Sequence, residues 1–320
     1  MTELYPMLLT PVSKEILWGG KKLKDAYNKT APFEKLAESW ELTVRQDGMN
    51  VIANGQHAGT TLGEYINEAG YSVVSANMRD RFPLLIKFID AADRLSIQVH
   101  PDNEYALREE NELGKTEMWY IVESEPGAQL VYGLKDGITK KEFAAAVKTG
   151  KVQDILHYVD VHPGEVYFIP AGQIHAIGAG ILIAEIQQNS NVTYRVYDYD
   201  RRGTDGSLRP LHTEKAIDVV QIRTEEEIRA LRFSDATGDP TEIASCAFFC
   251  VRKLNLTAEP ITLTAKDSFL SLLCTDGTGT IQMGDSTYPI CKGDSYFVPR
   301  GCPLISLTGT ATVLVSETKE

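Results

Sequence analysis

An internal repeat constrains the fold of this 320-residue chain more than any other feature of its sequence. Residues 164–175 read GEVYFIPAGQIH and residues 293–304 read GDSYFVPRGCPL, so the two segments align without a gap and share Gly, Tyr, Phe, Pro and Gly. In each copy a glycine permits the turn into a strand, and Pro-x-Gly forms a tight turn before the next strand. The repeat therefore predicts two related β domains.

The two copies differ at their last position, where the first copy has His175 and the second has Leu304. The second copy therefore keeps the residues that build the turn and loses the polar side chain that follows it. We expect the chemistry of the protein to belong to the domain of the first copy alone.

Short runs of Val, Ile, Tyr, Phe and Leu, broken by Gly, Pro, Asn or Asp, recur throughout the chain. Such runs are typical of an all-β sandwich or barrel, so we expect a mainly β fold. The clearest predicted strands are Trp40–Val44, Leu84–Phe88, Met118–Val122, Val166–Ile169, Ile181–Ile186, Phe269–Cys274 and Ala311–Ser316.

Helices are expected as insertions between the strands. In residues 139–150, Thr139 and Glu142 have the spacing of a capping box, alanines fill the middle, and Gly150 suits the C-terminal end. A second helical insertion is expected at about residues 102–115. Further short helices are predicted at residues 61–69 and 213–221.

The length of the chain agrees with a two-domain organisation, because domains commonly have roughly 150 residues. We predict a catalytic domain over residues 1–235, which carries the helical insertions, and a second β barrel over residues 236–320, which has no metal site.

Charge and composition exclude several classes of protein. The formal net charge of −12 has the wrong sign for a general binder of nucleic acid or of an anionic membrane. No stretch approaches the ~18 consecutive apolar residues of a membrane span, and the N-terminus does not resemble a signal peptide. The five cysteines lack a Cys-x-x-Cys pair, so free thiols are expected. We expect a cytoplasmic protein whose metal, if present, is held by histidine and carboxylate.

Four polar residues could form such a metal site. Gln98 and His100 point to the same face of a strand, and the following proline ends the ladder pairing. Glu117 begins an apolar run, and a carboxylate in a hydrophobic layer must be paired or bound to a metal. Together with His175, these groups suit a borderline divalent ion with an open position. The ligand types alone do not separate zinc from manganese, iron or cobalt.

Longer motifs resemble a known family. The spacing Gly-x5-Pro-x-Gly-x2-His resembles the second cupin motif, and Gln98-x-His100 with Glu117 resembles a first cupin motif that is split by an inserted helix. Four segments together resemble type I phosphomannose isomerase in its short bacterial form: Leu-Ser-Ile-Gln-Val-His-Pro, Gly-Lys-Thr-Glu-Met-Trp, Phe-Ile-Pro-Ala-Gly-x-x-His-Ala and Asn-Val-Thr-Tyr-Arg. The last 80 or so residues resemble only a degenerate cupin.

The resemblance implies a fold, an activity and a metal. It implies two cupin-type jelly-roll barrels and an aldose–ketose isomerase that interconverts mannose 6-phosphate and fructose 6-phosphate through an enediolate. It further implies one zinc ion held by Gln98, His100, Glu117 and His175, and a catalytic role for Arg195.

Isomerisation also requires a group that transfers a proton, and the sequence offers two candidates. Lys115 stands two residues before a candidate ligand, and Glu185 follows the apolar run that begins at Ile181. A lysine loses its proton more easily beside a dication, whereas a carboxylate needs little help. Both candidates stay open at this point.

A sugar phosphate requires cations, which this acidic chain must concentrate locally. Arg195, Arg201 and Arg202 fall within one tyrosine-rich segment, and the planar guanidinium suits phosphate oxygens. The alternative for this segment is a solvated loop with internal Asp–Arg pairs. By resemblance, Ser96 is a further candidate, whose hydroxyl would donate a hydrogen bond to the phosphate. Trp18 is a substrate-binding candidate that either stacks on the sugar or plugs the mouth of the barrel.

Two other functions compete with the isomerase. A mononuclear iron cupin dioxygenase also uses two histidines and a carboxylate, but the arginines and the added glutamine favour a sugar phosphate. A non-catalytic sugar-binding cupin is the third possibility, and the intact ligand set argues against it. The expected partner is a small-molecule sugar phosphate, with no nucleic acid and no membrane, and the chain is expected to act as a monomer or homodimer.

Overall fold

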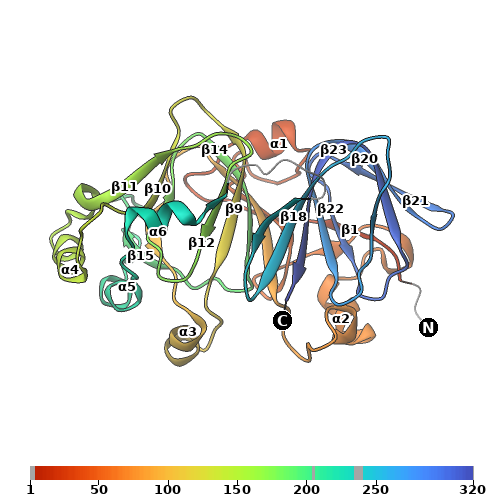
Figure 1. Cartoon of the computed structure of the whole chain (residues 1–320), viewed down its shortest axis with the longest axis horizontal. Helices are drawn as coiled ribbons and strands as arrows, with labels where there is room; N and C mark the ends of the chain where they lie inside the picture. The colour runs from red at the N-terminus through yellow and green to blue at the C-terminus, as the bar shows by residue number, and fades with distance from the viewer. Residues whose placement is uncertain (1–3, 204–205, 234–240, 320) are drawn as a thin grey trace. The chain divides into compact units, whose positions relative to one another are not determined.

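The computed structural model of the chain describes residues 4–203, 206–233 and 241–319. It is mainly β, as predicted, with short helices between the strands (Figure 1). The chain divides into two compact units. We call residues 15–21 and 89–234 the central unit, and residues 1–14, 22–88 and 235–320 the C-terminal unit.

The C-terminal unit is built around one large antiparallel sheet. Seven strands follow the order β17-β18-β23-β20-β22-β1-β6, while β19 pairs with β23 and β21 pairs with β20. The strands of this sheet are β1 (Met7–Thr10), β6 (Val51–Ile52), β17 (Thr241–Ser245), β18 (Phe249–Asn255), β19 (Ile261–Leu263), β20 (Leu270–Met283), β21 (Ser286–Cys291), β22 (Ser295–Val298) and β23 (Ile305–Thr318).

Smaller elements complete the C-terminal unit. Strand β2 pairs with β3, and β4 pairs with β5. These elements are β2 (Val12–Lys14), α1 (Lys22–Ala26), β3 (Glu38–Leu42), β4 (Val44–Arg45), β5 (Gly48–Met49), η1 (Gly55–His57), α2 (Leu62–Ala69) and η2 (Tyr71–Val73). Strand β7 (Leu84–Ala91) carries the chain into the central unit.

The two compact units group the chain differently from the expected division at residues 235 and 236. Strand β1 pairs with β22, with Met7 opposite Phe297, so the N-terminal strand belongs to the same sheet as the C-terminal repeat. A hydrogen-bonded ladder between the two ends of the chain leaves no local trace in the sequence. The prediction therefore assigned residues 22–88 to the first domain, whereas they cluster with the last.

The central unit contains two groups of strands. A five-stranded sheet has the order β11-β10-β13-β8-β15, and a second run has the order β16-β12-β9-β14. The strands are β8 (Ile97–Val99), β9 (Glu117–Ser124), β10 (Gln129–Leu134), β11 (Leu156–Asp160), β12 (Val166–Ile169), β13 (His175–Ile177), β14 (Ile181–Gln188), β15 (Tyr194–Tyr197) and β16 (Arg232–Phe233).

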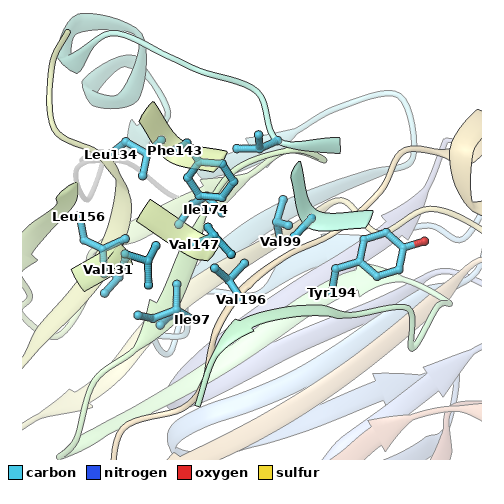
Figure 2. Packing of buried hydrophobic residues seen from close by; sticks show 14 of the residues in the cluster. Ile97, Val99, Val131, Leu134, Phe143, Val147, Leu156, Ile174, Tyr194 and Val196 are labelled. Carbon is cyan, nitrogen blue, oxygen red and sulfur yellow. The ribbon is translucent and has the colours of Figure 1, made fainter. Parts of the chain in front are cut away.

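Helices cover one face of the five-stranded sheet. Phe143 and Val147 from α4 (Lys140–Lys148) and Ala216 from α5 (Thr213–Val219) pack in one buried cluster with Ile97 and Val99 of β8. Figure 2 shows this cluster, and Figure 1 shows α4 and α5 beside β10, β11 and β15. Because side chains alternate along a strand, Gln98 points to the opposite face, away from the helices.

The predicted helices are present. Helix α4 begins with a capping box formed by Thr139 and Glu142, and Gly150 follows its end with a φ of +71°. Helix α3 (Asn103–Glu110) stops before the end of the predicted 102–115 insertion, because Asn111 takes the left-handed conformation with a φ of +53°. Helix α2 has a capping box as well. The η3 turn (Val152–Ile155) and α6 (Glu225–Ala230) lie outside the predicted segments.

The repeat has the same local structure in both units. Strand β12 of the first copy and strand β22 of the second are each followed by a Pro-x-Gly turn, with φ of +81° at Gly172 and +83° at Gly301. The residues after the turns differ in environment, because His175 is buried and Leu304 is 55% exposed. The scaffold of the repeat is thus conserved within the chain, and the buried polar group belongs to the first copy.

Two exclusions drawn from composition can be compared with the structure. Among the helices of the described ranges, none combines the length and the apolar character that a bilayer span requires. All five cysteines are described, and none of them forms a disulfide.

Candidate metal centre and active site

Three polar side chains form a row across the inner face of the five-stranded sheet. His175 of β13 lies opposite Gln98 of β8, and Gln98 lies opposite Arg195 of β15. Residues paired directly across an antiparallel ladder leave the sheet on the same side. The row therefore faces away from the apolar cluster that α4 and α5 cover.

Glu117 enters this space from the other group of strands, at the start of β9. Its side chain is fully buried, with Oε1 3.4 Å from His175 Nε2 and Oε2 3.7 Å from His100 Nε2. The candidate ligand atoms of these three residues all lie within 4.8 Å of one another. The sequence prediction that His100, Glu117 and His175 come together is consistent with this geometry.

Backbone carbonyl groups orient both imidazoles. His100 Nδ1 lies 2.9 Å from the carbonyl oxygen of Val192, and His175 Nδ1 lies 2.8 Å from that of Gln173. Each Nδ1 must donate to its carbonyl, so each Nε2 presents a lone pair toward Glu117. Metal-binding histidines are commonly held in this way.

Burial shifts the pKa of both an imidazole and the carboxyl group of this set. It lowers the pKa of His175 to about 4, so the imidazole is neutral at pH 7. Burial raises the pKa of Glu117 to about 8, with the Glu185 carboxylate adding to the shift and the Lys115 ammonium opposing it. A buried carboxylate with this environment is stabilised by a divalent ion, and the nitrogen and oxygen donors fit one.

Gln98 borders the same group. Its Nε2 lies 3.3 Å from His175 Nε2, and a half-turn of the amide would present Oε1, the atom able to coordinate a metal, at that point. Ser96 directly precedes β8, and its Oγ lies 3.5 Å from Gln98 Oε1, so this candidate for binding phosphate lies beside the same group.

Both candidates for proton transfer lie in the site. Lys115 Nζ is 2.8 Å from Glu117 Oε2 and 3.9 Å from Glu185 Oε1. The indole Nε1 of Trp119 donates to Glu185 Oε1 over 3.1 Å, and the Trp119 ring meets His175 edge-on. Since Lys115 and Glu185 are both buried and adjacent, they form one pair rather than two separated groups.

An arginine cluster surrounds a single buried carboxylate. Arg201 Nη2 donates to Asp198 Oδ1 over 2.5 Å, and Arg209 donates from Nε and Nη2 to the two oxygens of Asp198 over 2.7 Å. Internal Asp–Arg pairs were the alternative that the sequence left open for this segment, and Arg209 was not among the candidates. Asp198 and Arg209 are separated by the turn that follows β15, so no strand pattern connects them.

Arg195 belongs to this cluster as well as to the polar row. Burial, the Arg209 guanidinium and, to a smaller extent, that of Arg201 lower the pKa of Arg195, while Asp198 opposes the shift. Arg195 Nη1 donates to the carbonyl of Pro210 over 3.0 Å, and its buried Nε has no acceptor among the described residues. The three guanidinium groups face the buried Asp198 carboxylate and the exposed one of Asp93, which lies 3.9 Å from Arg201 Nη1, so positive charge stays in excess beside Gln98.

The remaining candidates differ in their surroundings. Trp18 is only 4% exposed, and its carbonyl oxygen accepts from the backbone of Asp93, which favours a packing role over stacking on a sugar. Arg202 is exposed and donates to the carbonyl of Gly206, as expected for a residue of a solvated loop.

Known proteins are similar in sequence to this chain over nearly its whole length. The family model described as phosphomannose isomerase type I, catalytic domain, matches residues 7–128, and the model described as mannose-6-phosphate isomerase, cupin domain, matches residues 240–318. The chain is 39% identical over 313 residues to mannose-6-phosphate isomerase ManA of Bacillus subtilis, across 97% of this chain and 98% of that protein. The chain belongs to the type I phosphomannose isomerase family.

Further comparisons of sequence and structure point to the same family. The chain is 35% identical to the mannose-6-phosphate isomerase of Streptococcus mutans, across 98% of this chain and 99% of that protein. The crystal structure of the mannose 6-phosphate isomerase of Bacillus subtilis has a TM-score of 0.86 at 35% identity, covering 98% of this chain and 99% of that one. A structure from Archaeoglobus fulgidus, at 18% identity and a TM-score of 0.78, shares the fold.

Membership of the phosphomannose isomerase family confirms the resemblance drawn from the motifs and the predicted cupin fold. It does not favour the dioxygenase or the non-catalytic sugar-binding cupin. The catalytic-domain match includes Gln98, His100, Lys115 and Glu117, whereas His175 and Arg195 lie outside both matched segments. The folded structure places His175 and Arg195 near the four residues that the catalytic-domain match includes.

Proposed function

We propose that this chain interconverts D-mannose 6-phosphate and D-fructose 6-phosphate as an intramolecular oxidoreductase. The observation that carries the proposal is the row of His175, Gln98 and Arg195 beside the buried Glu117. It joins a candidate metal group, which can stabilise the charge of an enediolate, to a cationic cluster, which can bind a phosphate. The relatives named above act on mannose 6-phosphate according to their names.

The metal site of the proposal consists of Gln98, His100, Glu117 and His175, with one zinc ion per chain. Two imidazoles, a carboxylate and an amide oxygen would suit a zinc ion. When bound, the ion supplies a Lewis acid that stabilises negative charge developing on the sugar oxygens.

The proton transfer is assigned to Lys115, with Glu185 as the group that holds it. One proton leaves C2 while the C1 carbonyl becomes an enediolate, a proton returns to C1, and the hydroxyl proton of O2 moves to O1. The amine of Lys115 lies between the Glu117 and Glu185 carboxylates, so Glu185 holds it beside the metal group, as a positioned proton-transfer group requires. Trp119 fixes Glu185 by hydrogen bonding.

The phosphate group of the substrate is assigned to the arginine cluster. Arg201 and Arg209 each retain N–H groups beyond those that bind Asp198, and a guanidinium presents five donors in all. Ser96 offers a hydroxyl from the residue that precedes β8. Arg195 stands between the cluster and the metal group, where it can stabilise the enediolate oxygens.

A coupled assay tests the proposed function. The purified chain is supplied with mannose 6-phosphate, and fructose 6-phosphate is followed with and without a chelator and after zinc is restored. Turnover that is lost with the chelator and recovered with zinc supports the proposal. Absence of turnover in the zinc-loaded protein, or full turnover in metal-free protein, contradicts it. The cytoplasmic location stays a prediction of the sequence.

A further inference from the structure

The backbone that carries Lys115 is held by bonds to other parts of the central unit. Over three consecutive residues, Gly114 N donates to Asn103 Oδ1 over 2.9 Å, Lys115 N donates to the carbonyl of Pro101 over 3.0 Å, and Thr116 N donates to Gln188 Oε1 over 2.9 Å. Two of the three acceptors are side-chain amides. Each residue of the segment is therefore fixed by a separate partner.

The two amide side chains are also bonded to each other. Gln188 Nε2 donates to Asn103 Oδ1 over 3.1 Å, so this one oxygen accepts both from Gln188 and from the backbone of Gly114. The backbone N–H of Gln188 donates to the carbonyl of Thr116 over 3.1 Å. Gln188 is 2% exposed at the end of β14. The half-buried Asn103 and the buried Gln188 thus connect α3, β14 and the segment before β9.

Gly114 allows this connection to be close. A Cβ at this position would lie 2.3 Å from the carbonyl carbon of Asp102 and 2.5 Å from the backbone nitrogen of Asn103. Real Cβ atoms do not approach backbone atoms so closely, so the segment rests directly on the first turn of α3. That turn follows His100 and Pro101 in the chain, so the candidate ligand and the candidate lysine share one rigid support.

The position of the Lys115 amine depends on this support. A lysine side chain has several rotatable bonds and loses much conformational freedom on burial, so its Nζ is placed only if its backbone is fixed. Lys115 is 5% exposed with Nζ 2.8 Å from Glu117 Oε2. We propose that Asn103 and Gln188 are positioning residues that hold the backbone of Lys115 for proton transfer. The inference rests on the proposed function.

The acceptor and donor roles of Asn103 and Gln188 predict different effects for conservative substitutions at the two positions. Asn103 Oδ1 accepts both bonds, so Asn103→Asp keeps this accepting oxygen and Asn103→Ala removes it. Gln188 uses one acceptor and one donor, so Gln188→Glu turns the donor into an oxygen that faces Asn103 Oδ1. Both Asn103→Asp and Gln188→Glu keep the shape of the side chain, but the first should be tolerated and the second should disrupt the connection.

The kinetic test compares these variants in the zinc-loaded protein. A displacement of about 1 Å can cost about 100-fold in rate, so we expect Asn103→Ala and Gln188→Glu to lower kcat by about 10- to 100-fold with KM for mannose 6-phosphate within about twofold. Asn103→Asp should restore kcat to within about threefold of the parent. Asn67→Ala, at an exposed position of α2, is the matched control and should change nothing. Equal kcat in Asn103→Ala and the parent overturns the inference, as does a loss that Asn103→Asp shares.

A second measurement does not depend on activity. Amide hydrogen exchange should speed up at least tenfold at Gly114 in Asn103→Ala, and unchanged exchange there overturns the inference. Asn103→Asp should keep the protection. Should the parent protein show no isomerase activity, the proposed function fails, while the exchange data still report whether these side chains hold the segment.

Discussion

Arg195 lies directly opposite Gln98 in the antiparallel ladder between β15 and β8. The pairing places a guanidinium beside a candidate metal ligand, on the face of the sheet that Glu117 also reaches. Asp198, three residues further along the chain, anchors Arg201 and Arg209 next to it. The register of one short ladder thus sets the spacing between the candidate metal group and the arginine cluster.

Removing either imidazole should abolish metal binding. His100→Ala and His175→Ala each delete a buried nitrogen donor whose lone pair faces Glu117, so both should lose bound zinc and fall below one hundredth of the parent's turnover. Metal content per chain and the coupled isomerase assay measure the two effects. His157→Ala on β11 is the matched control. A histidine variant that is metal-free but active would contradict the proposed metal site.

The arginines around Asp198 should contribute to substrate affinity. Arg201→Ala removes charge-assisted hydrogen bonds to an anion, so KM for mannose 6-phosphate should rise about tenfold or more with a smaller effect on kcat. Arg209→Ala should act in the same direction. Steady-state kinetics give both constants, with the exposed Arg202→Ala as the control. An unchanged KM in both variants would remove the cluster from phosphate binding.

Two substitutions can distinguish the role of Lys115 from that of Glu185. Lys115→Ala should lower kcat by ~10²–10⁴-fold, the usual contribution of a positioned proton-transfer group. Glu185→Gln keeps an oxygen for the Trp119 indole and should lower kcat less, because it changes only the partner of the lysine. Zinc content must be equal in both variants and the parent. A larger loss in Glu185→Gln would assign the proton transfer to Glu185.

The Asp198 cluster should make stability depend on pH. Burial acts to raise the pKa of Asp198, but the hydrogen bonds from Arg209 and Arg201 outweigh it and hold that pKa below its usual range. A lowered pKa in the folded state stabilises the fold above the unfolded value of about 3.9, and the contribution is lost as pH falls through the folded value.

Asp198→Asn should therefore lower the free energy of unfolding by about 1–3 kcal/mol at pH 7, with a smaller difference below pH ~4. Denaturant titrations of both proteins at a series of pH values measure the difference. A difference that stays constant from neutral to acid pH would show that the Asp198 carboxylate does not carry the effect.

Local features of the chain were predictable because their causes are local. Alternating apolar runs specify strands, Thr139 and Glu142 cap a helix within one turn, and Pro-x-Gly turns recur in both copies of the repeat. The candidate metal ligands were predictable as well, because a carboxylate such as Glu117 at the start of an apolar strand must be paired or metal-bound.

The residues alone were enough to predict a mainly β chain with an internal repeat, a His–Glu–His candidate group and membership of one family. The folded chain was needed to see that β1 joins the C-terminal sheet, that Arg209 shares Asp198 with Arg201, and that Asn103 and Gln188 are bonded to the segment of Lys115. Each of these depends on ladders, ion pairs or side-chain hydrogen bonds that close outside the periodicity of a single helix or strand. Such contacts are set by the packing of whole elements, so no local pattern of residues records them.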